Sequence, residues 1–200
     1  MALLGQGGRP TEPAYGKFRY CQPPETVFGN PLTARFTVSR GPDTRVFGKF
    51  ERDARGNTRL ELWADPISKI PQVALLWSSQ DRTDMVLDYQ GRLLSVMKRP
   101  AALASDAWLF GELVPTWSNQ RDRIGGYDAR KVSLKTEGTR AEAARDAGEC
   151  WIAESLMLVM RERFLRPDGS VQLWEITDVH QGPPELDVLA IPPGFRQSNP

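Results

Sequence analysis

The sequence predicts a mainly β protein of the α+β class. We expect a single curled antiparallel sheet, an unclosed β-barrel with a helical lid over its concave face. Short runs that alternate apolar and polar residues recur from Thr33 onwards, and Gly, Pro, Asp and Asn separate them. That pattern is typical of an antiparallel meander. Residues 101–114 have helical spacing instead. A sheet of about eight to ten strands does not stay flat, so its concave face must be covered.

Composition and charge exclude several classes of function. The chain has 200 residues, of which 40% are apolar and 26% are charged, as in an ordinary globular protein. Its 26 basic and 25 acidic residues nearly cancel, which removes the electrostatic reason to expect a nucleic acid or an anionic membrane as partner. No apolar run reaches the ~18 residues of a transmembrane segment.

The chain divides into an arm and a domain. Residues 1–32 are rich in Gly and Pro, and we expect an irregular N-terminal arm there. Residues 33–200 form the predicted sheet domain, without a linker or a repeat. The first ten residues lack the basic start and apolar core of a signal peptide.

The first strands form a predicted hairpin. Residues 33–40 and 45–52 alternate, and Gly56-Asn57 has the chemistry of a turn between strands. Phe50, Leu60 and Leu62 are predicted to face inwards. The charged residues of this region are predicted to lie on the solvated outside of the sheet, where cross-strand ion pairs are weak: Arg45, Glu51, Arg52, Arg55, Arg59 and Glu61.

The remaining elements follow in order. A Pro-bounded loop over 65–71 leads to further strand patterns. The helix over 101–114 is predicted from Leu103, Ala107, Phe110, Leu113 and Val114, and Pro115 is expected to end it. The polar, Ala-rich stretch 137–149 is either an exposed loop or one helical turn. The later strands are predicted within 72–80, 84–98, 127–136 and 150–182, with turns at Gln90-Gly91 and at 166–170.

An inward-facing apolar set carries the functional prediction. In the first strands it follows the period of two that places alternate residues on one face, and later apolar residues would extend the surface. The set is either the lining of an open cavity or a closed core, and the sequence leaves both open. The predicted lining residues are Phe36, Val38, Leu60, Leu62, Val73, Leu75, Trp77, Leu87, Leu93, Met97, Trp151, Leu156, Leu158, Met160 and Trp174.

Catalytic and metal-binding patterns are not predicted. The sequence has two cysteines, Cys21 and Cys150, and one histidine, His180, too few for a structural zinc site. The cysteines are either free thiols or one disulfide. A thiol nucleophile with His180 as base is less expected than a packed cysteine. Asp178 and His180 share a strand face, where turn hydrogen bonding is expected. No GxSxG, GxGxxG or GK[ST] motif occurs, and we predict no catalytic residue, cofactor or metal.

The order of these features resembles a known group of proteins. The hairpin "GKFERDARGNTRLELW" is followed by "VALLWSSQDRTDMVLDYQGRLLSVM", then "GGYDARKVSLK" and "CWIAESLMLVMRERFLRPDGSVQLWEI". The final motif "IPPGFR", at 191–196, resembles a C-terminal motif that is common in one superfamily of bacterial envelope proteins. Over about residues 33–196 the chain is similar to the LolA/LolB-like (lipoprotein-carrier-like) superfamily of bacterial envelope proteins, which includes RseB-like and uncharacterised periplasmic members.

The resemblance implies a fold, a location and a ligand. It implies an unclosed β-barrel with a helical lid over an apolar cavity, and a periplasmic protein whose signal peptide has been removed. It also implies that a lipid or lipoprotein acyl chain is the partner, held without catalysis. The alternative is a periplasmic scaffold with a filled core that binds another envelope protein through its sheet edge or its Arg-rich face. The lipoprotein carrier of this superfamily uses a specific arginine, and this chain has no residue that matches it. No acyl-transfer residue is therefore assigned.

Overall fold

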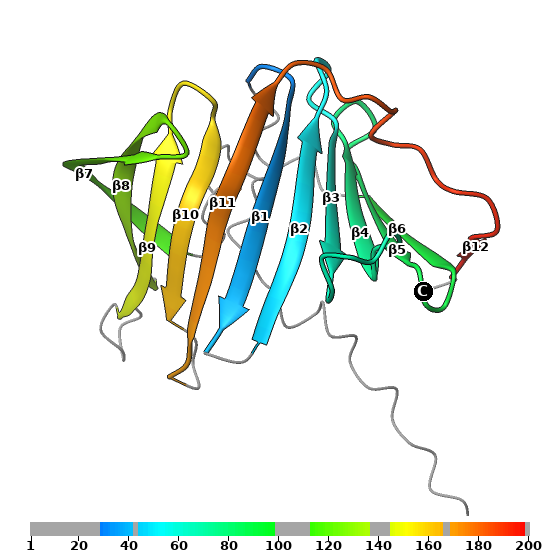
Figure 1. The fold of residues 1–200 in the computed structure, drawn as a ribbon, viewed down its shortest axis with the longest axis horizontal. Coiled ribbons are helices and arrows are strands. Elements are labelled where there is room, and N and C mark those ends of the chain that lie inside the picture. Colours follow the sequence, from blue (N-terminus) through cyan, green and yellow to red (C-terminus); the bar gives the residue numbers. More distant parts are fainter. Residues whose placement is uncertain (1–28, 42–43, 99–112, 137–144, 166–168, 199–200) are drawn as a thin grey trace, which may run out of the picture.

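A computed structural model describes residues 29–41, 44–98, 113–136, 145–165 and 169–198. Within these residues twelve strands form one sheet, with the order β12-β6-β5-β4-β3-β2-β1-β11-β10-β9-β8-β7 (Figure 1). The strands are β1 (Leu32–Arg40), β2 (Thr44–Arg52), β3 (Thr58–Trp63), β4 (Val73–Ser78), β5 (Thr83–Asp88), β6 (Leu93–Lys98), β7 (Leu113–Ile124), β8 (Tyr127–Thr136), β9 (Asp146–Ala153), β10 (Leu158–Leu165), β11 (Val171–Gln181) and β12 (Arg196–Gln197).

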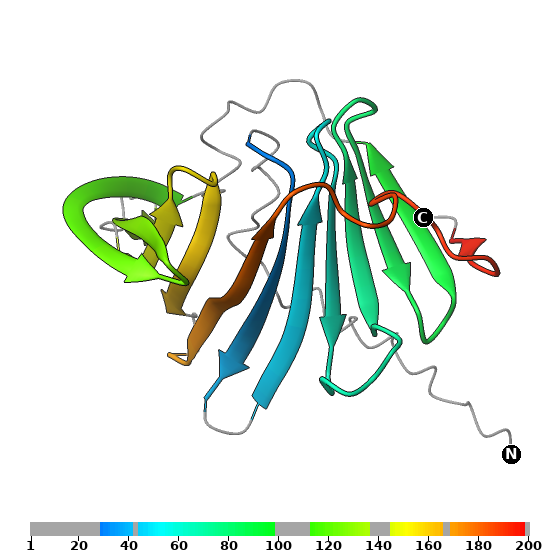
Figure 2. The same ribbon diagram turned by 45° about the horizontal axis from the view of Figure 1, so that its top comes forward.

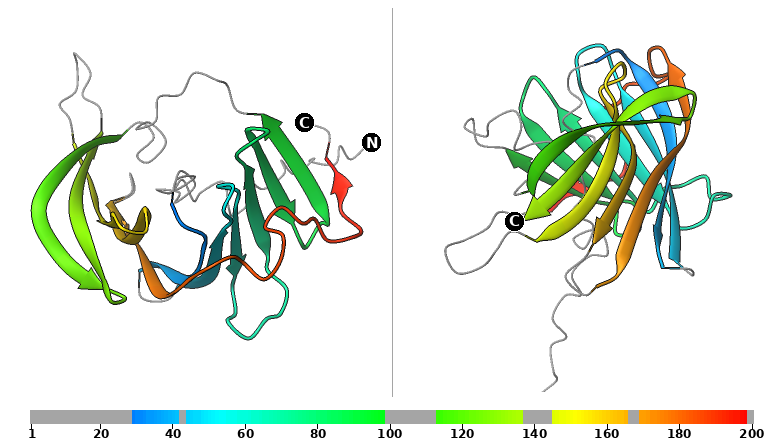
Figure 3. Two further views of the ribbon diagram at one scale, coloured as in Figure 1. Left: turned by 90° about the horizontal axis from the view of Figure 1, so that it is seen from above. Right: turned by 90° about the vertical axis from the view of Figure 1, so that its left-hand side faces the viewer.

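The sheet grows in both directions from β1. One wing runs from β2 to β6 through consecutive antiparallel pairs, and the other runs from β11 back to β7. Seen from above in Figure 3, both wings turn towards the same side, so the sheet is curled and unclosed. The predicted curled antiparallel sheet is confirmed, with more strands than expected. The predicted turn at Gly56 is also confirmed, because its φ is 78°.

The concave, inner face holds the core. Leu32, Ala34, Phe36 and Val38 alternate along β1 with at most 2% of their surfaces exposed. Phe36 lies opposite Gly48 on β2, where a Cβ would overlap its ring. The missing side chain lets Phe36 lie flat and stack on Trp174, with the ring centroids 3.7 Å apart.

The outer face of β4–β6 is also apolar, and a C-terminal strap covers it. The strap, residues 182–198, leaves β11 and crosses the sheet to β6, where β12 adds a short parallel strand (Figure 2). Beneath it lie Ala74, Leu76 and Leu87, with Leu189 and Phe195 of the strap packed against them. The prediction that Leu87 faces inwards is therefore wrong. Both faces of β5 carry apolar residues, so alternation alone could not choose the face.

The tip of the β7–β8 hairpin folds over the outer face of the other wing. Arg161 of β10 pairs with Asp122 of β7 at 3.3 Å, although two strands separate β10 from β7 in the sheet. A Cβ built on Gly125, in the hairpin turn, would lie 3.4 Å from Cε of Met160. Each wing therefore has a cover on its outer face, the strap on one and the hairpin tip on the other.

The predicted helix lies almost wholly outside the described residues, as do residues 1–28 of the predicted arm 1–32 and residues 137–144 of the polar stretch 137–149. The ends of both stretches belong to strands, since β1 begins at Leu32 and β9 at Asp146. The last two residues of the predicted helix, Leu113 and Val114, begin β7, so for them the helix prediction is wrong. Pro115 lies within β7 and does not end a helix. β7 is last in the sheet, where a strand can lack a backbone N–H without losing a ladder bond.

Candidate functional site

Ten of the fifteen predicted lining residues share the inner face. The strand register places them there, since directly paired residues lie on the same face of a sheet. The ten are Phe36, Val38, Leu60, Leu62, Val73, Leu75, Trp77, Leu93, Met97 and Trp174.

Exposure changes along this inner face. In its centre Phe36 is 1% exposed and Leu62 is 4% exposed. At the β6 wing Leu93 is 38% and Met97 is 64% exposed. Trp117 of β7, opposite Val132, is 41% exposed at the other wing. The inner surface is therefore packed in the middle and open to solvent at both ends. At the β6 end it also carries Asp88 and Asp84 of β5, which lie opposite Leu93 and Met97.

Three predicted lining residues lie on the outer face, under the β7–β8 tip. Trp151 is paired with Lys131 and Arg161, and the Lys131 Nζ lies 5.8 Å from the centre of its ring. Leu158 pairs with Ala153, two positions from Trp151 and so on the same face. Met160 occupies an irregularity in the β10 register and reaches the hairpin turn. For these residues the predicted face is wrong. In β10 the bulge at Met160 interrupts the period of two, so Leu158 and Glu162 lie on opposite faces, whereas Trp151 of β9 faces outwards with its register partner Arg161.

Arg52 is a buried cation on the inner face, which contradicts its predicted place outside. In the strand register Arg52 lies opposite Leu32, which faces inwards, and its side chain is 0% exposed. Its Nη2 donates to the carbonyls of Leu156 at 2.7 Å and Asn30 at 2.8 Å, and its Nη1 donates to that of Met157 at 3.2 Å. Burial lowers the pKa of Arg52 to about 10. Arg52 thus ties β2 to the β9–β10 turn, which also buries the predicted lining residue Leu156.

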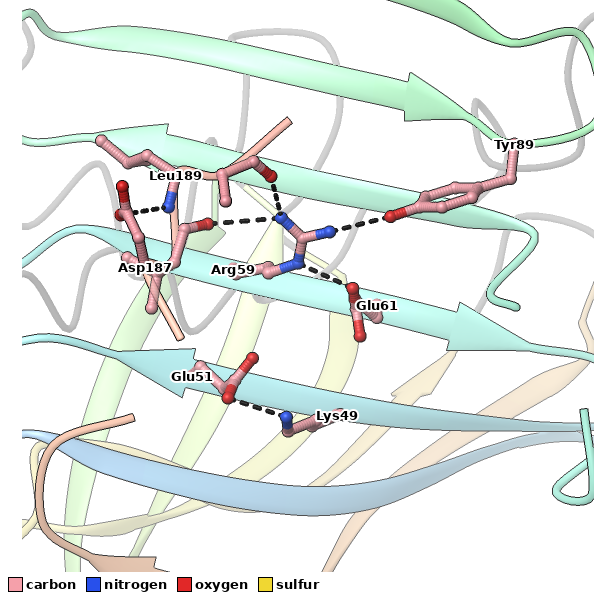
Figure 4. A network of polar contacts seen from close by, with 9 residues as sticks. Lys49, Glu51, Arg59, Glu61, Tyr89, Asp187 and Leu189 are labelled. Carbon is pink, nitrogen blue, oxygen red and sulfur yellow. Dashed lines mark hydrogen bonds and ion pairs between the residues drawn. The ribbon is translucent and has the colours of Figure 1, made fainter. Parts of the chain in front are cut away.

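A second buried arginine holds the strap (Figure 4). The Nη1 of Arg59 donates to the carbonyls of Ala190 at 2.8 Å and Val188 at 3.5 Å. Its Nη2 donates to the hydroxyl of Tyr89 at 2.8 Å, and its Nε donates to a carboxylate oxygen of Glu61 at 2.7 Å. Burial raises the pKa of Tyr89. Every nitrogen of this guanidinium has an acceptor, which a buried charge requires.

The charges of the hairpin therefore do not all mark a solvated face. Arg59 is 8% and Glu51 is 6% exposed. Glu51 pairs with Lys49 at 2.7 Å on the same strand (Figure 4). Glu51 and Arg59 do face outwards, as predicted, but their side chains are buried.

Residues suited to catalysis are not brought together. Cys150 is a free thiol, fully buried on the inner face, and Cys21 lies outside the described residues. The side chain of His180 is 75% exposed and pairs with Asp178 at 2.8 Å. Among the described residues no group of three His, Cys, Asp or Glu side chains could hold a metal ion. In the same residues no helix has the length and apolar character to cross a membrane.

Comparisons with known proteins give the fold alone. No protein-family model and no curated protein matches the sequence. An uncharacterised conserved protein from Thermus thermophilus superposes with a TM-score of 0.55 at 14% identity, over 88% of this chain and 94% of that one.

Two other solved structures are more distant. MucB in complex with MucA matches with a TM-score of 0.48 at 14% identity, over 86% of this chain and 57% of that one. A LolA superfamily protein from Nitrosomonas europaea matches with a TM-score of 0.35 at 10% identity, over 81% and 91%. The likeness to the Thermus thermophilus protein supports the fold of the sheet, and the resemblance to the LolA/LolB-like superfamily stays a prediction from the sequence.

Proposed function

We propose that this protein is a non-enzymatic component of the bacterial envelope that holds an acyl chain of a lipid or lipoprotein against its inner face. The observation that supports it is the apolar inner face of β1 to β4, together with the exposed apolar side chains of Leu93 and Met97 on the inner side of β6. The resemblance of the sequence to the LolA/LolB-like superfamily supports a periplasmic location.

The physical argument needs no reactive group. Each methylene of an acyl chain that leaves water gains about 0.8 kcal/mol. Leu93 and Met97 lie on the inner side of the β6 wing, so an approaching chain would meet them before it meets the packed centre. We therefore assign these two residues to the entrance of the acyl site.

A matched pair of substitutions tests the site. Met97→Arg places a charge on the inner side of β6, and Val96→Arg places the same charge on its outer side, where Val96 is 42% exposed. Because both positions are exposed, both variants should fold. We expect the parent to bind a fluorescent fatty-acid analogue with micromolar affinity, Met97→Arg to bind at least tenfold more weakly, and Val96→Arg to bind like the parent.

Organic extraction of the purified parent, followed by mass spectrometry, checks the ligand class. A co-purified lipid carrying an acyl chain is the expected result. Equal binding by a folded Met97→Arg variant and the parent would remove the inner face as the site. A parent that neither carries lipid nor binds the analogue would reject the proposed function.

A further inference from the structure

The middle of the outer face has a separate character. We define the central outer strip as the outward-facing residues of β2, β1 and β11 together with Arg161 and Arg163 of β10. It lies between the strap on one wing and the β7–β8 tip on the other. The outward residues of β1 are all polar: Thr33, Arg35, Thr37 and Ser39. Phe47 of β2 and Leu173 of β11 face outwards beside them, so the strip is more polar than the strap-covered outer face but not free of apolar side chains.

The carboxylates of the central outer strip are already paired with neighbouring basic side chains. Three acidic side chains face outwards on these four strands, and each one has a basic partner. The pairs are Glu51 with Lys49 at 2.7 Å, Glu175 with Arg161 at 2.9 Å and Asp178 with His180 at 2.8 Å.

Three arginines of the strip have no such partner. Arg35 of β1, Arg45 of β2 and Arg163 of β10 are exposed. In the described part of the chain none of these guanidinium groups has an ion pair or a hydrogen bond, and Arg45 only lies over the ring of Phe47, 5.5 Å from its centre. The strip therefore presents surplus positive charge, although the chain as a whole is almost neutral.

The register fixes how these charges are spaced. In the strand register Arg45 lies opposite Ser39, Ser39 lies opposite Leu173, and Leu173 lies opposite Arg163. Arg45 and Arg163 therefore lie in one row across the sheet, three strands apart. Strands are about 4.8 Å apart, which separates the two backbones by about 14 Å. An extended chain covers this distance in about four residues. Arg35 lies four residues along β1 from Ser39, about 13 Å away.

We propose that the central outer strip binds an acidic segment of a partner protein. Arginine suits carboxylates because its planar fork can make two parallel hydrogen bonds with them. A segment that carries carboxylates about four residues apart would match Arg45 and Arg163. A flat lipid surface fits less well, since the strap and the β7–β8 tip lie over the outer face on both sides of the strip.

The test compares two triple variants. The strip variant carries Arg35→Gln, Arg45→Gln and Arg163→Gln. The control variant removes three exposed cations outside the strip, by Arg55→Gln, Lys69→Gln and Lys98→Gln, and so has the same net charge.

The probe is a fluorescein-labelled peptide with glutamates four residues apart, followed by fluorescence anisotropy at low salt, with its glutamine analogue as reference. We expect the parent to bind the glutamate peptide, the strip variant to bind at least tenfold more weakly and the control variant to bind within threefold of the parent. Binding should weaken as salt is added. Uptake of the fatty-acid analogue should not change in the strip variant, so this test and that of the proposed function can fail independently.

Several results would overturn the inference. Equal losses in the two triple variants would mean that only net charge matters. Absence of binding by the parent would remove the site. If the strip variant instead lost binding to phosphatidylglycerol vesicles and kept its affinity for the peptide, the strip would be a surface for lipids.

Discussion

Replacement of Arg59 by methionine should loosen the C-terminal strap. Arg59 is 8% exposed and its guanidinium donates to two strap carbonyls, to Tyr89 and to Glu61. Methionine keeps most of the apolar volume but donates no hydrogen bond. The variant leaves the carboxylate of Glu61 and the carbonyl of Ala190 without their best donor.

The magnitude follows from those contacts. A hydrogen bond to a charged group contributes about 1.5–3 kcal/mol, and removal of one partner of a buried pair costs about 3–5 kcal/mol. Lys49 lies directly opposite Glu61 across the ladder and can compensate part of its charge. We therefore expect a loss of about 3 kcal/mol, which in a chain of this size lowers Tm by about 6–12 °C.

Urea unfolding followed by circular dichroism measures the loss, and hydrogen exchange locates it. The amides of Arg196 and Ser198 donate to carbonyls of Arg92 and Leu94, at the start of β6, and should lose protection before the rest of the sheet. Arg35→Met is the matched control, because Arg35 is exposed on the same face, and its stability should stay within about 0.5 kcal/mol of the parent. An Arg59→Met protein as stable as the control, with protected strap amides, would refute the role of Arg59.

Two further predictions concern packing and pH. Gly48→Ala should destabilise the protein by about 1–3 kcal/mol because the new methyl group overlaps the ring of Phe36, and Phe36→Leu in the same chain should recover part of that loss in a double-mutant cycle of urea unfolding. Burial raises the pKa of Tyr89 above its usual 10.0, so stability should be full below about pH 10 and fall as pH rises further; Tyr89→Phe should reduce this alkaline loss in unfolding curves measured between pH 8 and 11.

The sequence predicted the inner face well where one face of a strand is apolar and the other is polar. In β1 and β3 the alternation places Phe36, Val38, Leu60 and Leu62 inwards, and the register agrees. The turn at Gly56 was also predictable, since a positive φ favours glycine between two strands. In these strands the hydrophobic pattern and the turn chemistry specify the same register.

Prediction failed where both faces of a strand are covered. In β5, Val86 faces inwards and Leu87 outwards, and the apolar pair does not say which is which. In β10 the irregularity after Val159 shifts the faces of Leu158 and Met160, and nothing in the apolar run signals an extra residue. Burial of the outer face comes from segments distant in the sequence, the strap and the β7–β8 tip, whose docking cannot be read from local periodicity.

Three arginines show how such covering segments decide the role of a residue. Arg35, Arg52 and Arg59 lie on three adjacent strands, β1, β2 and β3. Arg52 faces inwards and is satisfied by backbone carbonyls of the β9–β10 turn and of Asn30, and Arg59 faces outwards under the strap. Arg35 faces outwards where neither segment reaches. Because buried charges must be fully paired, substitution of Arg52 or Arg59 acts mainly on stability. Arg35 is exposed, so its substitution leaves the fold intact and reports on binding.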